Sequence, residues 1–369
     1  MVLFHRIANF LFWGMCMGGI LCSPFFSFAN TPPILKPKLA YPLKIKPEIS
    51  GSFAELRSTH FHGGMDFRTK QKEGLPVRSV ADGFLFKISV RKNSYGKAIY
   101  IKHDNGLVSI YGHLSRFRPF LERMVKKAQK QSGQYEVTLD NLSIPIEKKE
   151  RIARSGNTGS SFGPHLHFEL RRSSPLVNSS NKTVSYKEYL LNPCLFGLRV
   201  EDRLPPLLLS LAIYPLDTLS KIQCPFFDTL SKVPVYIPIS LLPDTLRLSG
   251  RIGFGLEALD TIENLPFHYG LYELAFMIDK DTLAYYRLDS ISVENSSKIN
   301  EHIDLPYYKL TKKRIEKSYV NSNALFSPYS TLKEEGSFTP IIDQKYLLRI
   351  VGRDFSGNTS SLSLILSTP

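Results

Sequence analysis

Residues 98–113 read AIYIKHDNGLVSIYGH, and this stretch decides the fold class. Two β-prone runs flank Asp-Asn-Gly at 104–106, and a turn sequence of this kind between apolar runs favours a tight β-hairpin. We therefore predict an antiparallel pair of strands on either side of the turn. Residues 80–90 and 144–153 also have strand composition, so the sequence indicates a mainly β, antiparallel fold around this hairpin.

One segment departs from the strand pattern and follows a helical one. Its apolar residues recur at intervals of three and four, which places them on one face of a helix. The sequence therefore predicts one amphipathic helix, inserted in the β domain at about 116–131. The residues expected on its apolar face are Phe120, Leu121, Met124, Val125 and Ala128.

The chain has 369 residues, 43% of them hydrophobic and 12% aromatic, which is too apolar for a disordered chain and too long for one small domain. Glu-Asp-Arg-Leu-Pro-Pro at 201–206 gives the best domain boundary. After it, apolar runs at 207–214 and 233–241 and a final strand-turn-strand pattern from Tyr346 predict a β-sandwich-like domain. We expect a signal peptide at 1–29, an extended proline-rich lead-in at 30–50, a β-core domain at 51–200 and a C-terminal domain at 205–369.

The first 29 residues have the order of a secretory signal peptide. A basic start at Arg6 precedes an apolar run from Ile7 to Leu21, and residues 27–29 place small side chains before a cleavage point. An uncleaved membrane anchor is the alternative, because the apolar run approaches the length of a membrane span. We predict cleavage, export to the periplasm or cell envelope, and no stable membrane span afterwards.

Export leaves two cysteines, Cys194 and Cys224, which either form one disulfide or remain free thiols. The formal net charge is +14, and in an exported protein this favours an anionic polymer such as cell wall, or lipid headgroups, as a partner. The basic residues are scattered and do not alternate with aromatic residues, so we expect no nucleic-acid partner.

The clearest chemical pattern is GPHLHFEL at 163–170. Side chains alternate between the two faces of a strand, so His165, His167 and Glu169 share one face and the apolar residues between them share the other. The apolar face can enter a core. This leaves two imidazoles side by side over a cleft.

A second pattern, HGGMD at 62–66, places His62 and Asp66 on one side of the chain, and its glycines allow a close approach of the backbone. Imidazole and carboxylate are ligands for Zn²⁺, and a catalytic zinc keeps three protein ligands and an open position. His62, Asp66 and one imidazole of the His-Leu-His pair would complete this set. The remaining imidazole would be left for proton transfer.

A third pattern, YGHL at 111–114, ends the hairpin strand. By strand alternation Tyr111 and His113 share a face, and His113 is expected to point at the same cleft. The other histidines after the expected signal peptide are expected to be structural, surface or packing residues without a metal, and they are His60, His103, His268 and His302.

In this order the three patterns resemble the lysostaphin/LytM-type zinc metallopeptidases. The likeness consists of His-x-x-x-Asp at 62–66, Tyr-Gly-His-Leu at 111–114 and GNTGSSFGPHLHFE at 156–169, within about 50–170. Residues 50–57, SGSFAELR, also resemble exported wall peptidases of the Bacteroidetes type. The resemblance implies a small antiparallel β-sheet peptidase core with its site in a groove.

The resemblance also implies a cofactor, site residues and a substrate. His62, Asp66 and His167 match the zinc ligands of the family, and His113 and His165 match its two catalytic histidines. The implied activity is that of an exported zinc metalloendopeptidase, which hydrolyses peptide bonds in the stem peptides or cross-bridges of peptidoglycan with Zn²⁺ and histidine acid/base help. The resemblance assigns no substrate-binding residue.

Two questions stay open at this level. All five matched residues are present, which favours an active enzyme, and the alternative is a catalytically silent wall-binding or regulatory module of the same fold. The insertion around 116–131 lies where the shortest family members have none, so the bond that is cut stays open. The C-terminal domain is expected to position the enzyme or to dock a protein regulator.

Overall fold

The structure is a computed structural model. It describes residues 38–177, 183–223, 231–320 and 328–369. These residues belong to one compact unit, Pro37–Pro369. The expected signal peptide at 1–29, the first part of the lead-in and Cys224 lie outside the described residues. None of the described helices is long and apolar enough to cross a membrane.

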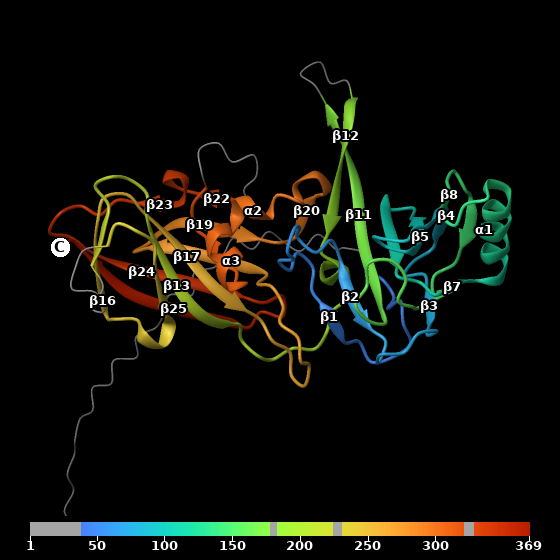
Figure 1. Cartoon of the computed structure of the whole chain (residues 1–369), viewed down its shortest axis with the longest axis horizontal. Coiled ribbons are helices and arrows are strands. Elements are labelled where there is room, and N and C mark those ends of the chain that lie inside the picture. The colour runs from blue at the N-terminus through green and yellow to red at the C-terminus, as the bar shows by residue number, and fades with distance from the viewer. Residues whose placement is uncertain (1–37, 178–182, 224–230, 321–327) are drawn as a thin grey trace, which may run out of the picture. The chain divides into compact units, whose positions relative to one another are not determined.

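The N-terminal part of the described chain forms a ten-stranded and a three-stranded sheet, both antiparallel (Figure 1). Their strands are β1 (Ile49–Gly51), β2 (Met65–Arg68), β3 (Pro76–Arg78), β4 (Gly83–Val90), β5 (Lys97–Lys102), β6 (Leu107–Gly112), β7 (Arg116–Phe117), β8 (Val137–Leu139), β9 (Ile144–Ile146), β10 (Arg151–Arg154), β11 (His165–Val177), β12 (Thr183–Leu191) and β20 (Ser290–Ser292). The large sheet has the order β1-β2-β11-β6-β5-β4-β8, with β12 beside β11, β20 beside β12 and β9 beside β4. The small sheet has the order β3-β10-β7.

The hairpin that the sequence predicts is confirmed. β5 and β6 pair antiparallel, with Ile99 opposite Tyr111. In the turn Gly106 has a left-handed φ of 77°, and the amide of Leu107 donates to Oδ1 of Asn105 at 3.1 Å. The turn therefore requires glycine at position 106 and, at position 105, a residue with a short side chain that accepts a hydrogen bond.

The two other strand predictions for this part are confirmed with different bounds. The strand expected at 80–90 is β4, which begins at Gly83. The strand character at 144–153 is divided between β9 and β10. The division arises because the chain turns between them, where Lys149 adopts a left-handed φ of 67°.

The inserted helix is α1 (Pro119–Ser132). Proline in its first turn and Gly133, with a left-handed φ of 65°, mark its two ends. Leu121 and Val125 are buried in the core of the large sheet, whereas Phe120 is 49% exposed. The helix is confirmed, and its apolar face is narrower than predicted.

The apolar faces of β4, β5, β6 and β11 form the core of this part. Leu85, Ile99, Tyr111 and Phe168 have 0% of their surface exposed. Burying a side chain of this size contributes about 1.5–3 kcal/mol relative to leaving it exposed. The core therefore fixes which face of β11 points away from it.

The C-terminal part forms a five-stranded and a seven-stranded sheet. Their strands are β13 (Leu207–Pro215), β14 (Lys221–Gln223), β15 (Val235–Pro238), β16 (Thr245–Ser249), β17 (Ile252–Leu259), β18 (Glu273–Ile278), β19 (Asp281–Arg287), β21 (Glu316–Lys317), β22 (Thr331–Leu332), β23 (Ser337–Phe338), β24 (Lys345–Arg353) and β25 (Thr359–Ser367). The orders are β15-β13-β17-β21, with β23 beside β17, and β14-β16-β25-β24-β18-β19-β22. One apolar core contains residues of both sheets, as in a β-sandwich.

The strands expected at 207–214 and from Tyr346 to the end are confirmed as β13, β24 and β25. The run at 233–241 forms a shorter strand, β15, because a 3₁₀ turn follows Pro238. The described helical segments that follow β12 in the chain are η1 (Pro193–Phe196), η2 (Ile239–Leu241), η3 (Val293–Asn295), α2 (Ile299–His302), α3 (Leu305–Thr311) and η4 (Glu334–Gly336). Both parts are thus mainly β, as the sequence predicts.

The two parts exchange core residues across the expected boundary at 201–206. Phe61 and Leu190 lie in the apolar core of the C-terminal sheets, and Ile262 and Tyr269 lie in that of the N-terminal sheets. β20 extends the N-terminal sheet through its pairing with β12. The division into two domains stays our proposal.

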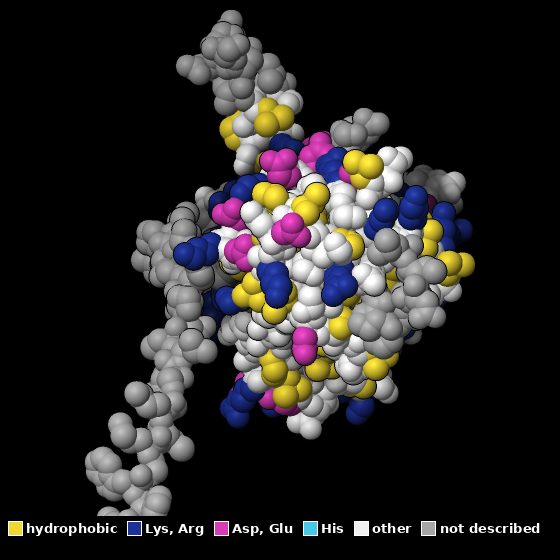
Figure 2. Space-filling model, turned by 90° about the vertical axis from the view of Figure 1, so that its left-hand side faces the viewer, with side chains coloured by type: hydrophobic (Ala, Val, Ile, Leu, Met, Phe, Trp, Pro, Cys, Tyr) yellow, Lys and Arg dark blue, Asp and Glu magenta, His cyan; other side chains and the backbone are white. Residues whose placement is uncertain are grey.

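Figure 2 shows one face of the C-terminal part. Among the described residues, basic, acidic and apolar side chains are mixed on this face, and they lie singly or in small groups. This face carries no patch of a single charge that would select a polyanion by itself.

Candidate metal centre

The site is built on β11 and on the strand beside it, β2. β11 pairs with β2 and places His167 opposite Asp66. The apolar residues that alternate with His165, His167 and Glu169 have 0% of their surface exposed. The three polar side chains therefore share the face of β11 that points away from the core, as the alternation predicts.

Gly64 allows the chain entering β2 to come this close to β11. A Cβ atom at this position would overlap the carbonyl oxygen of Phe168. Any other residue would push the two strands apart and separate Asp66 from His167. The close backbone approach expected from the glycines at 63 and 64 is thus a condition for the site.

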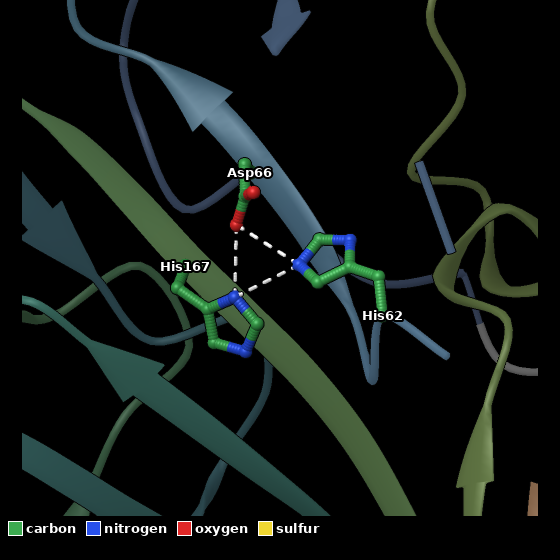
Figure 3. A group of neighbouring side chains, drawn as sticks. All are labelled: His62, Asp66 and His167. Carbon is green, nitrogen blue, oxygen red and sulfur yellow. Dashed lines mark hydrogen bonds and ion pairs between the residues drawn. The ribbon is translucent and has the colours of Figure 1, made fainter. Parts of the chain in front are cut away.

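Three polar side chains point at one another here (Figure 3). Nε2 of His62 lies 3.1 Å from Oδ1 of Asp66 and 3.2 Å from Nδ1 of His167. Nδ1 of His167 lies 2.8 Å from the same Asp66 oxygen. All three residues are buried. The structure thus brings together the three ligands that the family resemblance implies.

The outer nitrogen of each imidazole is held by a protein acceptor. Nδ1 of His62 donates to the carbonyl of Ser52 at 2.7 Å, and Nε2 of His167 donates to Oε1 of Glu169 at 2.9 Å. Each ring therefore directs its inner nitrogen toward the other ring and toward the Asp66 carboxylate. When these two nitrogens carry no proton, the three groups can hold a cation between them. Two imidazoles and one carboxylate form the donor set of an open zinc site, so these residues fit that ion.

A set of charged and polar residues holds Glu169 in turn. Nε and Nη2 of Arg171 donate to its Oε2 at 2.9 and 2.7 Å, and the hydroxyl of Tyr95 donates to Oε1 at 2.6 Å. Burial alone would raise the pKa of Glu169, but the hydrogen bond and charge of His167 and the charge of Arg171 lower it to about 2. The sequence-based prediction gave Glu169 no role, although its place on the face of His167 is the signal that marks it.

Asp66 also has a partner outside the cluster. Nη2 of Arg57 donates to its Oδ2 at 3.0 Å, and Nε of Arg57 lies 3.3 Å from Oε1 of Glu55. Burial opposes the charged form, but the charge of His62 and hydrogen bonds from the surrounding imidazoles hold the pKa of Asp66 well below its usual range. The carboxylate is thus ionised, with one oxygen on Arg57 and the other directed at the imidazoles.

The two histidines expected to be catalytic lie beside this cluster. The rings of His113 and His165 are 4.7 Å apart, and Nε2 of His165 lies 3.4 Å from Oδ1 of Asp66. Nδ1 of His113 donates to the carbonyl of Thr158 at 2.7 Å, and Nδ1 of His165 donates to that of Gly163 at 2.8 Å. Backbone carbonyls therefore orient both rings and leave each Nε2 as the atom that accepts a proton.

The prediction that Tyr111 and His113 share a face is wrong. The ring of Tyr111 lies in the core, 5.3 Å from that of Phe168, whereas the ring of His113 lies 5.7 Å from that of His167 on the opposite face. β6 ends at Gly112, and His113 adopts a left-handed φ of 56°. This conformation, uncommon for a residue with a side chain, redirects the imidazole to the site.

The remaining described histidines do not join the cluster. His103 is buried at the base of the hairpin turn, where its two nitrogens bond to a carbonyl and to a serine hydroxyl. His302 is buried, and its Nε2 lies 2.6 Å from Oε2 of Glu316. His60 and His268 are exposed, and His60 lies at the edge of the cavity described next.

The cluster opens into a cavity of about 920 Å³. Residues of the C-terminal part line it together with the five site residues, and these additional residues are Phe267, Val293, Ser296 and Arg314. Nε of Arg314 is buried and has no hydrogen-bond partner among the described residues. The sequence gave no signal for these residues, because they come from loops and turns of the other part of the chain.

Two imidazoles and a carboxylate, with two further histidines at their side, are the kinds of side chain that a metallopeptidase site uses. Residues 60–134 match the family model described as Peptidase family M23. The chain therefore carries a domain of Peptidase family M23, which confirms the resemblance to the lysostaphin/LytM-type enzymes. Membership of a metallopeptidase family implies a bound metal.

Curated relatives match about a third of the chain. DD-carboxypeptidase/endopeptidase Mpg of Neisseria meningitidis is 35% identical over 123 residues, which are 33% of this chain and 23% of Mpg. An uncharacterized metalloprotease of Haemophilus influenzae is 32% identical over 144 residues, 37% of this chain and 26% of the relative. Peptidoglycan DD-endopeptidase ShyA of Vibrio cholerae is 33% identical over 137 residues, 35% of this chain and 26% of ShyA. The match thus spans about a quarter of the length of these relatives.

Proposed function

We propose that this protein is an exported zinc metalloendopeptidase that hydrolyses peptide bonds in the stem peptides or cross-bridges of peptidoglycan. The observation that carries the proposal is the convergence of His62, Asp66 and His167 within 3.2 Å, with two further histidines beside them. The printed names of Mpg and ShyA support a peptidoglycan substrate. Export rests on the signal sequence at 1–29.

Zinc would be held by Nε2 of His62, Oδ1 of Asp66 and Nδ1 of His167. When bound, it supplies a Lewis acid for the scissile carbonyl and for water. The carbonyl of Ser52 and the carboxylate of Glu169 orient the two imidazoles through their outer N–H groups. The protein therefore provides two imidazoles in a fixed orientation and the carboxylate of Asp66 as ligands for the metal.

His113 and His165 would move the protons of the reaction. Each ring presents an unprotonated Nε2, which can accept a proton from the attacking water. The protonated ring then donates to the leaving amine, or donates a hydrogen bond to the oxyanion that forms on the scissile carbonyl. Both rings are held in the same way, by a carbonyl at Nδ1, so either ring can fill either role.

Arg314 would bind an acidic group of the substrate. The side chain of Arg314 lines the cavity, and its guanidinium lies 4.9 Å from the ring centroid of Tyr308. Its buried Nε has no protein acceptor among the described residues. Arginine is the side chain best suited to hold a carboxylate. Stem peptides carry such groups, so the cavity wall contributed by the C-terminal part is proposed to hold the substrate.

Release of new amino groups from purified peptidoglycan tests the proposal. The zinc-loaded protein is compared with a chelated sample, with a chelated sample given back zinc, and with His167→Ala. His60→Ala is the matched control, because His60 lies at the cavity edge outside the cluster. We expect activity that disappears with chelation, returns with zinc, survives in His60→Ala and is absent from His167→Ala. Zinc binding without amine release from any wall type would instead favour a wall-binding or regulatory module.

A further inference from the structure

Three further carboxylates come together outside the cluster of His62, Asp66 and His167. Asp202, Asp260 and Asp354 each offer an oxygen, and these oxygens lie within 4.8 Å of one another. Asp202 belongs to the segment that joins the two parts, Asp260 follows β17, and Asp354 follows β24. The cluster thus joins three segments that are far apart along the chain.

No ion pair joins this cluster to a cationic side chain among the described residues, and Arg199 lines the same cavity as Asp202 and Asp260. Asp260 is 5% exposed and Asp354 2%, and Oδ1 of Asp260 is buried without a hydrogen-bond partner. Arg203, next to the cluster in sequence, forms an ion pair with Glu201. A buried carboxylate is unfavourable unless a cation or hydrogen bonds stabilise it.

The hydrogen bonds that the cluster does accept come from neutral donors. Oδ1 of Asp354 accepts from the amides of Gly357 and Asn358 at 2.7 and 3.0 Å, and its Oδ2 accepts from Nδ2 of Asn358 at 2.7 Å. Oδ1 of Asp202 accepts from the amide of Leu204 at 3.0 Å. These bonds hold two of the carboxylates in place and leave their charge uncompensated.

A cavity of about 60 Å³ lies against Asp202 and Asp260. A water molecule takes about 30 Å³ in the liquid, so the space suits an ion with one or two waters. Tyr269 and Tyr272 also line this cavity.

We propose that Asp202, Asp260 and Asp354 bind a calcium ion. Calcium takes oxygen ligands at about 2.4 Å, and oxygens up to about 4.8 Å apart can therefore contact the same ion. The unpartnered Oδ1 of Asp260 supplies a buried ligand, and the cavity supplies room for water ligands. No imidazole or thiolate belongs to the cluster, which favours a hard cation over zinc.

The ion would link the C-terminal part to β1, the strand that pairs with β2 at Asp66. Asp260 forms a β-bridge with Tyr269, and the hydroxyl of Tyr269 donates to the carbonyl of Ile49 at 2.9 Å. Ile49 begins β1, whose Gly51 pairs with Asp66. Calcium would thus act on stability and on the seating of β1, and it would take no part in hydrolysis.

A proton is the other species that can neutralise this cluster. Burial, with repulsion from Asp202 and Asp354, raises the pKa of Asp260 to about 8. A protonated cluster and a calcium site respond differently to Asp260→Asn. The amide imitates a protonated carboxyl group, whereas it removes the charged ligand that calcium needs.

Calcium binding to the zinc-loaded protein tests the proposal. Terbium luminescence excited through the nearby tyrosines and displaced by calcium measures binding, and the unfolding temperature measures the effect on stability. We expect one bound calcium per chain in the wild-type protein and in His167→Ala, with an affinity reduced at least tenfold in Asp260→Asn. Asp104→Asn, in the exposed hairpin turn, is the matched control and should bind as the wild type does.

Two results would overturn the proposal. One is a wild-type protein whose unfolding temperature and terbium signal do not respond to about 10 mM calcium, which is roughly ten times the dissociation constant of the weakest extracellular sites. The other is an Asp260→Asn variant that folds, binds zinc and still binds calcium as tightly as the wild type. A variant that is more stable than a calcium-insensitive wild type would show that the cluster holds a proton. If Asp260→Asn does not fold, Asp202→Asn takes its place in the comparison.

Discussion

The cluster of His62, Asp66 and His167 and the cluster of three aspartates both bury carboxylates, but only the first surrounds them with charged partners. Arg57 and Arg171 compensate the carboxylates around the first cluster. The aspartate cluster accepts hydrogen bonds only from neutral donors among the described residues. The charged partners of the first cluster therefore hold its side chains in place before a metal binds. The aspartate cluster, in contrast, depends on its cation for stability.

The two clusters also differ in the elements that carry them. The first lies largely on paired strands, where β2 and β11 fix the spacing of Asp66 and His167. The aspartates lie at strand ends and in the joining segment. Strands hold side chains at defined distances, as a reacting centre requires. Strand ends and a joining segment that are held together by an ion suit a role in stability.

Asp66→Asn should break the first cluster and leave the second intact. The amide removes the charged ligand, so we expect zinc to be lost and amine release to fall to background. Zinc content per chain and hydrolysis of peptidoglycan measure the effect, and calcium binding should stay at the wild-type value. Full zinc content with unchanged hydrolysis would contradict the assignment of Asp66 as a ligand.

His113→Ala and His165→Ala should separate metal binding from proton transfer. Loss of a positioned acid or base lowers kcat by about 10²–10⁴-fold. We expect kcat to fall in that range with zinc content unchanged. If either variant also loses zinc, that histidine is a ligand and the division of roles proposed above is wrong.

Glu169→Gln should weaken the first cluster without removing a ligand. Loss of a carboxylate that orients a metal-bound imidazole costs about 10–100-fold in metal affinity or activity. Competition with a zinc chelator measures the affinity. Glu188→Gln is the control, because Glu188 bonds to the far side of Arg171 and is half exposed. Equal effects in the two variants would mean that the ion pair with Arg171, and not the bond to His167, is what matters.

Arg314→Gln should have the smallest effect of the four. A hydrogen bond to a charged group contributes about 1.5–3 kcal/mol, so KM for a peptide with a free carboxylate should rise about tenfold or more. We expect kcat to change little, since Arg314 lies outside the zinc cluster. Lys309→Gln, at an exposed position on α3, serves as the control for lost positive charge. An unchanged KM would remove Arg314 from the substrate site.

The sequence predicts those features that depend on one strand or one turn. The alternation around His165 and His167 lies within a single strand, and the Asp-Asn-Gly turn fixes its own hairpin. The helix at 116–131 follows from its spacing, although the width of its buried face does not, because its neighbours decide which side chains are covered. The resemblance of the three motifs to a known family then implies which residues are the ligands.

Features that depend on register or on an unusual backbone conformation are not visible in the sequence. Asp66 meets His167 through a strand pairing between positions about a hundred residues apart. His113 reaches the site through a left-handed φ that alternation cannot anticipate. Glu169 was on the correct face, but only its bond to His167 shows what it does. Arg314 and the aspartate cluster depend on contacts between the two parts.

The exchange of core residues between the two parts has a consequence for how the chain unfolds. Phe61, next to the proposed ligand His62, is buried in the C-terminal core, and Tyr269 is buried in the N-terminal one. Each core contains side chains from the other part of the chain, so neither core is complete alone. The chain should therefore unfold in a single cooperative transition. A cut at 201–206 would then yield two fragments with open hydrophobic cores, and the histidines of the catalytic fragment would lose the packing that holds them.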